Sequence, residues 1–360
     1  MHLCHHPLCC FVPPYMAETL QTSEDPAARQ VALASLGNEY RTARRLLSQQ
    51  FMAPATISEI AGEQMARAPI AGKTRYIFDM RGVSDPLPGN LVRQEGDRAI
   101  DDEAVNEAYD HSGDVYDFYQ AVFERDSLDD AGLPLRSSVH VGDTFNGPMS
   151  NAFFNGKQMA YGDGDGNLFT RFTRSLDVVG HELTHGVLNF TSKLDYFGES
   201  GALNESFADI MGALIGQWKS NQTVDQADWY IGKEVLGPGA GIRGVRTFKA
   251  EKAFENDANF GTDPQPKHYR DRYRGSRDRG GVHINSGIPN HAFYLAAKAI
   301  GGYGWEKAGK IWYVAMKSGL ESDATFGEAA RATIAIAGYY GNGSDEQNAV
   351  RSAWQQVGVI

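Results

Sequence analysis

Residues 175–189 read SLDVVGHELTHGVLN and place two histidines and one glutamate within five positions. Apolar side chains recur through this stretch at helical spacing, at Leu176, Val179, Leu183 and Val187. This spacing predicts a helix with one face toward a core. His181 and His185 then lie one turn apart on the same face. Two imidazoles at that spacing can hold one metal ion, and the adjacent Glu182 can act as general base on a metal-bound water.

A second stretch supplies the further ligand that such a site needs. The H-E-x-x-H pattern alone also fits two exposed helix histidines, whereas a hydrolytic zinc site takes three protein ligands and leaves a position for water. Glu205 lies in the run GALNESFAD at 201–209, within an amphipathic segment from about Glu199 to Trp218. Asp209 follows on the same face, where its carboxylate can accept the second N–H of a metal-bound imidazole. A solvated acidic face is the alternative reading of Glu205 and Asp209.

Together these stretches resemble the thermolysin family of metalloproteases. The resemblance rests on HELTH and GALNESFAD and continues, in the family's order, through NAFF at 151–154, YGDGDG at 161–166 and GGVHINSGI at 280–288. It extends from about Thr74 to the C-terminus. It implies an α+β, two-domain fold, with a mixed α/β N-terminal domain, a mainly α-helical C-terminal domain and the zinc helix between them.

The resemblance also implies roles for particular residues. One catalytic Zn²⁺ would be held by His181, His185 and Glu205, with Glu182 as general base and Asp209 behind the ligands. His283 and Tyr196 would stabilise the oxyanion, with Asp278 orienting His283. The substrate backbone would be held by Asn151, by the Ala152 carbonyl on an exposed edge strand, and by Arg246, for which the nearby Arg243 is an alternative. An open strand edge suits an endopeptidase, because it can pair with any extended chain.

Six apolar positions align with the pocket for the residue after the scissile bond: Phe169, Phe172, Val178, Ile231, Val235 and Val245. Burying a Leu, Ile or Phe side chain there contributes about 1.5–3 kcal/mol. A charged side chain would be left without a partner. Cleavage before bulky hydrophobic residues is therefore predicted.

The double calcium site that many thermolysin-like enzymes carry is predicted to be lost. Its ligands would fall at Asp177, Asp228 and three further positions, which here are Gly216, Tyr230 and Lys233. Too few hard oxygen donors remain. The GDGDG run at 162–166 resembles half a calcium loop without its later glutamate, and a tight turn is the preferred reading.

The N-terminal segment is predicted to be a propeptide. The stretch FVPPY at 11–15 resembles the short pro-segment of the protealysin-like branch, so residues 1–52 are assigned to a propeptide that ends between about Ser48 and Ala61. Residues 53–192 and 193–360 then form the two catalytic domains. No charged region followed by an apolar core marks a secretory signal. A cytoplasmic location and export without an ordinary signal peptide, including secretion, both stay open.

Latency is expected from the same segment. Pro13 and Pro14 stiffen an extended stretch from Phe11 to Tyr15 that could lie along the cleft. All three cysteines fall within the first ten residues. A thiolate of Cys9 or Cys10 could occupy the open zinc position, with simple burial of these thiols as an equal alternative.

The amino-acid composition and net charge limit the classes of molecule that the chain is expected to bind. The 360 residues are 42% hydrophobic with a formal net charge of −11, which disfavours nucleic acid and anionic membranes. No apolar run reaches membrane-spanning length. Peptide or protein substrates and the chain's own propeptide are the expected partners, the chain is expected to be a monomer, and the resemblance implies a small emfourin-like protein inhibitor. A zinc-binding pseudoenzyme and an exopeptidase are the alternatives, although Glu182, Tyr196 and His283 are all present.

The coarse pattern predicts strands and mixed segments before the zinc helix and helices after it. A strand is predicted over 74–80, a helix over 102–125, and short strands over 138–141, 152–154 and 157–161. One or two helices are predicted over 25–51. Later helices are predicted over 199–219, 289–300, 305–318, 325–339 and 344–356. His283 is placed in a short apolar strand.

Overall fold

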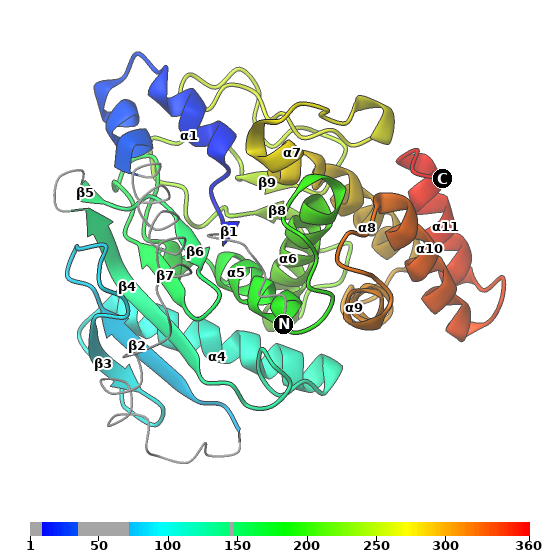
Figure 1. Cartoon of the computed structure of the whole chain (residues 1–360), viewed down its shortest axis with the longest axis horizontal. Helices are drawn as coiled ribbons and strands as arrows, with labels where there is room; N and C mark the ends of the chain where they lie inside the picture. Colours follow the sequence, from blue (N-terminus) through cyan, green and yellow to red (C-terminus); the bar gives the residue numbers. More distant parts are fainter. Residues whose placement is uncertain (1–8, 35–71, 144–146) are drawn as a thin grey trace, which may run out of the picture.

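A computed structural model describes residues 9–34, 72–143 and 147–360. It has a half built around a sheet and a half built of helices, with helices α5 (Leu176–Asn189) and α6 (Gly198–Lys219) between them (Figure 1). This arrangement is the predicted two-domain α+β fold. Among the described residues, no helix is both long and apolar enough to cross a bilayer.

The main sheet has the strand order β1-β6-β7-β4-β2-β3, with β5 paired to β4. The strands are β1 (Cys9–Cys10), β2 (Arg75–Asp79), β3 (Asn90–Gln94), β4 (Leu135–Asp143), β5 (Gly147–Pro148), β6 (Ala152–Phe154) and β7 (Met159–Gly162). Helix α4 (Glu103–Phe123) packs on this sheet and begins where the Asp102 carboxylate accepts the Val105 N–H. β6, which was predicted to be an exposed edge strand, is therefore not at the edge of the sheet, because β1 from the N-terminal segment pairs with it.

The helical half contains α7 (Arg277–Asn285), α8 (Gly287–Ile300), α9 (Ala308–Ser318), α10 (Phe326–Ala337) and α11 (Asp345–Gln356). A small hairpin of β8 (Tyr230–Ile231) and β9 (Arg246–Thr247) lies on the cleft side of α6. Short 3₁₀ turns cover Phe172–Arg174, Tyr269–Asp271 and Gly338–Tyr340.

Two glycines let α5 and α6 approach closely. A Cβ on Gly180 would lie 2.7 Å from Ile215 Cδ1, and one on Gly212 would lie 2.5 Å from the Asp177 carbonyl oxygen. Larger side chains at either position would push the helices apart. The glycines therefore bring the histidine face of α5 within reach of Glu205 on α6.

Two predictions about local structure need correction. Helix α1 (Pro14–Gln21) begins at Pro14, so the extended stretch ends at Pro13 and does not include Tyr15. A proline at the first helical position loses no hydrogen bond and has the right φ, which explains the early start. His283 lies in α7 and not in a strand. Residues 26–34 are helical as predicted, while the rest of the predicted helix and the propeptide boundary near Ala53 lie outside the described residues.

Candidate metal centre and active-site cleft

Two helices bring His181, His185 and Glu205 together. The two Nε2 atoms of the histidines are 3.1 Å apart, and each lies 3.5 Å from one carboxylate oxygen of Glu205. One ligand atom from each residue fits within 4.8 Å of the others. All three side chains are buried, so their polar atoms need a partner inside the protein.

Two hydrogen-bond acceptors on the outer side of the histidines orient their Nε2 atoms toward a shared cation position. His185 Nδ1 lies 2.7 Å from Asn204 Oδ1, and His181 Nδ1 lies 2.8 Å from Asp209 Oδ1. Both rings thus carry their proton on the outer nitrogen and turn the lone pair of Nε2 inward. Burial lowers the pKa of His185 to about 3, which keeps this ring neutral. Within the described part of the chain, Glu205 Oε2 is buried without a hydrogen-bond partner. Two imidazole nitrogens and a carboxylate in this arrangement fit a zinc ion.

Glu182 lies beside the triad and is fully buried. Its Oε2 accepts the backbone N–H of Phe154 at 2.9 Å. Its Oε1 is buried, and no described residue hydrogen-bonds to it. Burial and the charge of Glu205 raise the pKa of Glu182 well above its ordinary value. A carboxylate with a raised pKa and one unpaired oxygen is suited to receive a proton.

His283 and Tyr196 form a pair of donors above the triad. The Tyr196 hydroxyl donates to Glu205 and lies 3.2 Å from His283 Nε2. Asp278 holds His283 from behind, with its Oδ1 2.7 Å from Nδ1 and its Oδ2 accepting the backbone N–H. Burial alone would lower the pKa of His283, but the charges of Glu205 and Asp278 outweigh it and raise the pKa to about 9.

The turn between Asp278 and His283 has an unusual backbone. Four successive residues from Asp278 to Gly281 have positive φ values between 49° and 84°. Gly280 and Gly281 tolerate this conformation without a side-chain clash. The turn folds the Asp278 carboxylate back onto the ring of His283.

A second buried ion pair supports the triad. Arg246 donates to both oxygens of Asp209, with Nη2 2.8 Å from Oδ1 and Nε 2.9 Å from Oδ2, and Asn290 donates to Oδ2 at 2.8 Å. Burial would raise the pKa of Asp209, but Arg246 and His181 outweigh it and hold the pKa below its ordinary value. Asp209 is therefore ionised where it faces the Nδ1–H of His181.

Comparison with known proteins places this geometry in a family. The pattern of the thermolysin metallopeptidase catalytic domain matches residues 66–189, and that of the thermolysin metallopeptidase alpha-helical domain matches residues 192–359. The chain belongs to the thermolysin metallopeptidase family. It is accordingly a metalloendopeptidase, as the sequence motifs predicted.

Relatives of this thermolysin-family chain include proteins of nearly the same length. It is 41% identical to an extracellular metalloprotease of Pectobacterium carotovorum subsp. carotovorum, over 98% of this chain and 97% of that protein. It is 39% identical to protease PrtS of Photorhabdus sp. (strain Az29), over 97% and 91%. Among solved structures, the precursor of protealysin, a metalloproteinase from Serratia proteamaculans, matches with a TM-score of 0.84 and 41% identity. That match covers 98% of this chain and all of the other.

The N-terminal segment of this thermolysin-family chain fills its own cleft. β1 pairs with β6 in antiparallel register, Cys10 opposite Phe153. The Phe11 N–H then donates to the Ala152 carbonyl at 3.0 Å. Asn151 and Arg246, both predicted to hold substrate, also bond to the backbone of Phe11 and Val12. The alternative residue Arg243 instead pairs with Glu251 at 3.5 Å.

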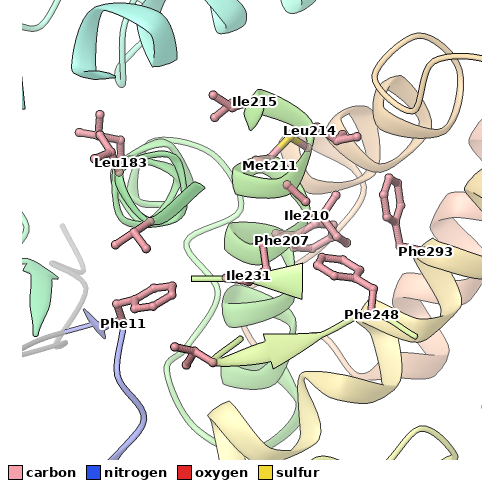
Figure 2. Close-up of a cluster of buried hydrophobic side chains, with 14 of the residues drawn as sticks. Phe11, Leu183, Phe207, Ile210, Met211, Leu214, Ile215, Ile231, Phe248 and Phe293 are labelled. Carbon is pink, nitrogen blue, oxygen red and sulfur yellow. The ribbon is translucent and has the colours of Figure 1, made fainter. Parts of the chain in front are cut away.

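The Phe11 ring enters the predicted specificity pocket. It points from the β1 segment toward Ile231 in β8 (Figure 2), and its centroid lies 6.4 Å from that of Phe172 and 5.4 Å from that of His181. The six predicted pocket residues are completely buried and belong to the same apolar cluster as Phe11. A Cβ on Gly232 would lie 2.7 Å from the Phe11 ring, so this glycine leaves room for a large side chain.

The structure does not support zinc ligation by Cys10. Its side chain packs with Met80, Val141, Met149, Phe153 and Ala160, in a cluster separate from the metal triad. Strand alternation explains this placement, because Cys10 and Phe11 point to opposite faces. Burial, the alternative reading, holds for Cys10, while the side chain of Cys9 lies outside the described residues.

Four contributors to the site were missed by sequence reasoning: Phe154, Asn204, Gly232 and Asn290. Phe154 acts through its backbone, so its side chain gave no signal. Asn204 precedes Glu205 in the GALNESFAD run and was available as a histidine partner. Gly232 and Asn290 depend on long-range packing.

At the positions where the family's calcium ligands would fall, several side chains bond to other residues of this protein. The Asp177 carboxylate accepts from the Ser175 hydroxyl and from the Gly232 N–H. Lys233 pairs with Asp228, and the Tyr230 hydroxyl donates to Glu251. The GDGDG run forms the predicted turn, in which Asp165 accepts the N–H groups of Leu168 and Phe169.

Proposed function

We propose that this chain is the latent precursor of a zinc endopeptidase that cuts before bulky hydrophobic residues. The observation that carries the proposal is the N-terminal segment, which occupies the cleft through contacts that an extended substrate would make. The precursor of protealysin, to which this chain is similar over its whole length, supports a precursor form.

The proposed chemistry uses the groups around the triad. A zinc ion held by His181, His185 and Glu205 would polarise the scissile carbonyl and lower the pKa of its water. Glu182 would accept a proton from the attacking water and deliver it to the leaving amine, because its Oε1 is buried and no described residue hydrogen-bonds to it. His283 and Tyr196 donate hydrogen bonds to the carbonyl oxygen as negative charge develops there.

Substrate selection is assigned to the pocket around Phe11. A Phe, Leu or Ile side chain would replace the Phe11 ring among apolar walls, whereas a charged side chain would lose its hydration without a partner. Profiling of a peptide library should show cleavage before such residues. A preference for Asp or Lys at that position would contradict the assignment.

An endopeptidase is favoured over an exopeptidase by the course of the N-terminal segment. Backbone pairing continues on both sides of residues 10 and 11, from Cys9 opposite Phe154 to Val12 beside Asn151. A cleft that holds chain on both sides accepts internal bonds. The zinc-loaded mature enzyme should therefore degrade casein and leave a single-residue amide substrate intact, and the reverse result would favour an exopeptidase.

The remaining assignments complete the proposal. Residues 1–52 form the propeptide, 53–192 the first catalytic domain and 193–360 the second. The relative from Pectobacterium is named an extracellular metalloprotease, which favours export for this chain as well. The mature enzyme is proposed to act as a monomer without the double calcium site, and to be open to an emfourin-like inhibitor.

A further inference from the structure

The backbone of the N-terminal segment is fixed on both sides of one peptide bond, between Cys10 and Phe11. On the amino side, Cys10 pairs with Phe153 in the β1–β6 ladder. On the carboxyl side, Phe11 donates to the Ala152 carbonyl at 3.0 Å and accepts from Arg246 Nη1 at 2.8 Å. Such two-sided pairing holds a bond in one register.

Asn151 extends this hold by one more residue. Its Oδ1 accepts the Val12 N–H at 2.8 Å, and its Nδ2 donates to the Val12 carbonyl at 3.4 Å. The four backbone groups of Phe11 and Val12 are thus all bonded to the cleft. A shift of the segment by one residue would break each of these bonds and move the ring of Phe11 out of its pocket.

The carbonyl of Cys10 is the one that faces the catalytic groups. Its oxygen lies 3.2 Å from His283 Nε2, which is itself 3.2 Å from the Tyr196 hydroxyl. The ring of the next residue, Phe11, lies against the ring of His181 with centroids 5.4 Å apart. The Cys10 carbonyl therefore occupies the position where a scissile carbonyl would be polarised.

The side chains around this bond also suit cleavage. Phe11 lies in the apolar pocket with no exposed surface. The bond itself is not prolyl, because Phe11 follows Cys10 directly and the next proline, Pro13, comes two residues after Phe11.

We infer that the Cys10–Phe11 bond is an internal substrate, which the chain hydrolyses within its own cleft before the rest of the propeptide is removed. This inference rests on the proposed endopeptidase function. One water is consumed: its oxygen bonds to the Cys10 carbonyl carbon, the C–N bond breaks, and the proton taken by Glu182 passes to the Phe11 nitrogen. The products are a peptide of residues 1–10 with a new carboxylate and a chain that begins with the amine of Phe11.

The shortened chain should persist as a distinct species. Helix α1 follows at Pro14 and packs its Met16 and Leu20 side chains into the core. Glu18 on this helix also lies 3.5 Å from Arg277 of the catalytic part. These contacts are unaffected by the cut, so the remaining pro-segment stays docked after residues 1–10 leave.

The test follows the full-length, zinc-loaded protein by intact-mass spectrometry and N-terminal sequencing, with casein hydrolysis measured in parallel. A species beginning at Phe11 should appear before the species that has lost the whole propeptide. Because the bond lies in the molecule's own cleft, its first-order rate should stay constant over a 100-fold dilution. A rate that rises in proportion to protein concentration would overturn the intramolecular step.

Two matched substitutions test the register. Phe11→Leu keeps an apolar side chain and should still be cut at the same bond, whereas Phe11→Asp should abolish this cut. Leu33→Asp introduces the same charge at a propeptide position that is 51% exposed, and it should leave the cut unchanged. In metal-free protein, where no hydrolysis occurs, Phe11→Asp should lower the melting temperature more than Leu33→Asp does.

The outcomes separate this inference from the proposed function. If casein is degraded while the Cys10–Phe11 bond stays intact in every species, the inference is wrong and the endopeptidase function stands. If the zinc-loaded protein, with or without its propeptide, cuts neither casein nor this bond, both are wrong. An unchanged cut in Phe11→Asp, or equal melting temperatures of the two metal-free variants, would also overturn the register.

Discussion

Replacing Phe11 with alanine should release the active site without touching any catalytic group. The Phe11 ring is fully buried and lies between Phe172, His181 and the Arg246 guanidinium, which is 4.6 Å from its centroid. Truncating a buried Phe to Ala in a packed core costs about 3–5 kcal/mol, of which the transfer of the ring from water supplies about 1.5–3 kcal/mol. The backbone bonds of residue 11 remain possible with alanine.

The transfer part alone sets the expected size of the effect. The cavity penalty of the closed state would add to this effect, so the transfer part of about 1.5–3 kcal/mol is a lower bound. At about 1.4 kcal/mol per tenfold change, the ratio of closed to open molecules should fall at least about 10- to 150-fold. Initial hydrolysis of a fluorogenic peptide should rise by the same factor, up to the activity of the mature enzyme.

The assay must be completed before the chain shortens. Initial rates are taken within the first minutes, and intact-mass spectrometry verifies that the precursor is unprocessed. Leu33→Ala, which removes an exposed apolar side chain from the same segment, serves as the control and should stay as latent as the wild type. If folded Phe11→Ala protein is equally latent, the pocket contact does not hold the cleft closed, and the reasoning fails.

Three further predictions concern the general base Glu182, the half-buried His140 and calcium. Glu182→Ala should still bind one zinc ion, measured by elemental analysis, and lose about 10²–10⁴-fold of its peptidase activity; a metal-loaded variant with full activity would contradict the mechanism. Hydrogen bonds to Asp163 and Asp102 raise the pKa of His140 from its ordinary value of 6.5 to about 9, although partial burial of the ring acts in the opposite direction. The stabilisation from protonated His140 is thus complete below pH 6.5 and lost as the pH rises through about 9. The melting-temperature deficit of His140→Asn should therefore shrink over this range, and a deficit that grows would refute the assignment. A calcium-specific chelator should leave the melting temperature unchanged, because Lys233 supplies a positive charge beside Asp228, and a clear drop would show that calcium is bound.

The parts of the fold that could be predicted are those set by local spacing. The spacing of His181 and His185 is enough to put both rings on one face of α5. The apolar periodicity predicted one buried face, whereas all residues from 178 to 188 are buried, because the histidine face is covered by other elements as well. The predicted helix over 199–219 agrees with α6 within one residue. Once two such helices are antiparallel neighbours, the position of Glu205 on α6 places its carboxylate against the two histidines.

The parts that could not be predicted depend on residues far apart in the chain. Cys10 pairs with Phe153 across more than a hundred residues, and no periodicity specifies which strand edge a two-residue strand will join. The return of Asp278 onto His283 was expected, but the backbone of this turn was not, because four consecutive residues with positive φ are not favoured by any local rule. Gly232 gave no signal either, since its role appears only when the Phe11 ring is placed against it.

Latency is better tested by substituting Phe11 than by substituting Arg246, because Arg246 has two separate roles. The same guanidinium holds the Phe11 carbonyl and both oxygens of Asp209, which in turn faces the ring of His181. Removing Arg246 would therefore weaken the closed state, leave a buried carboxylate without its partner and disturb the metal triad together. Opposite effects on latency and activity would then cancel in one measurement. The Phe11→Ala change removes only the ring and keeps the backbone bond to Arg246. Because residue 11 belongs to the propeptide and is absent from the mature enzyme, this change affects the closed state alone.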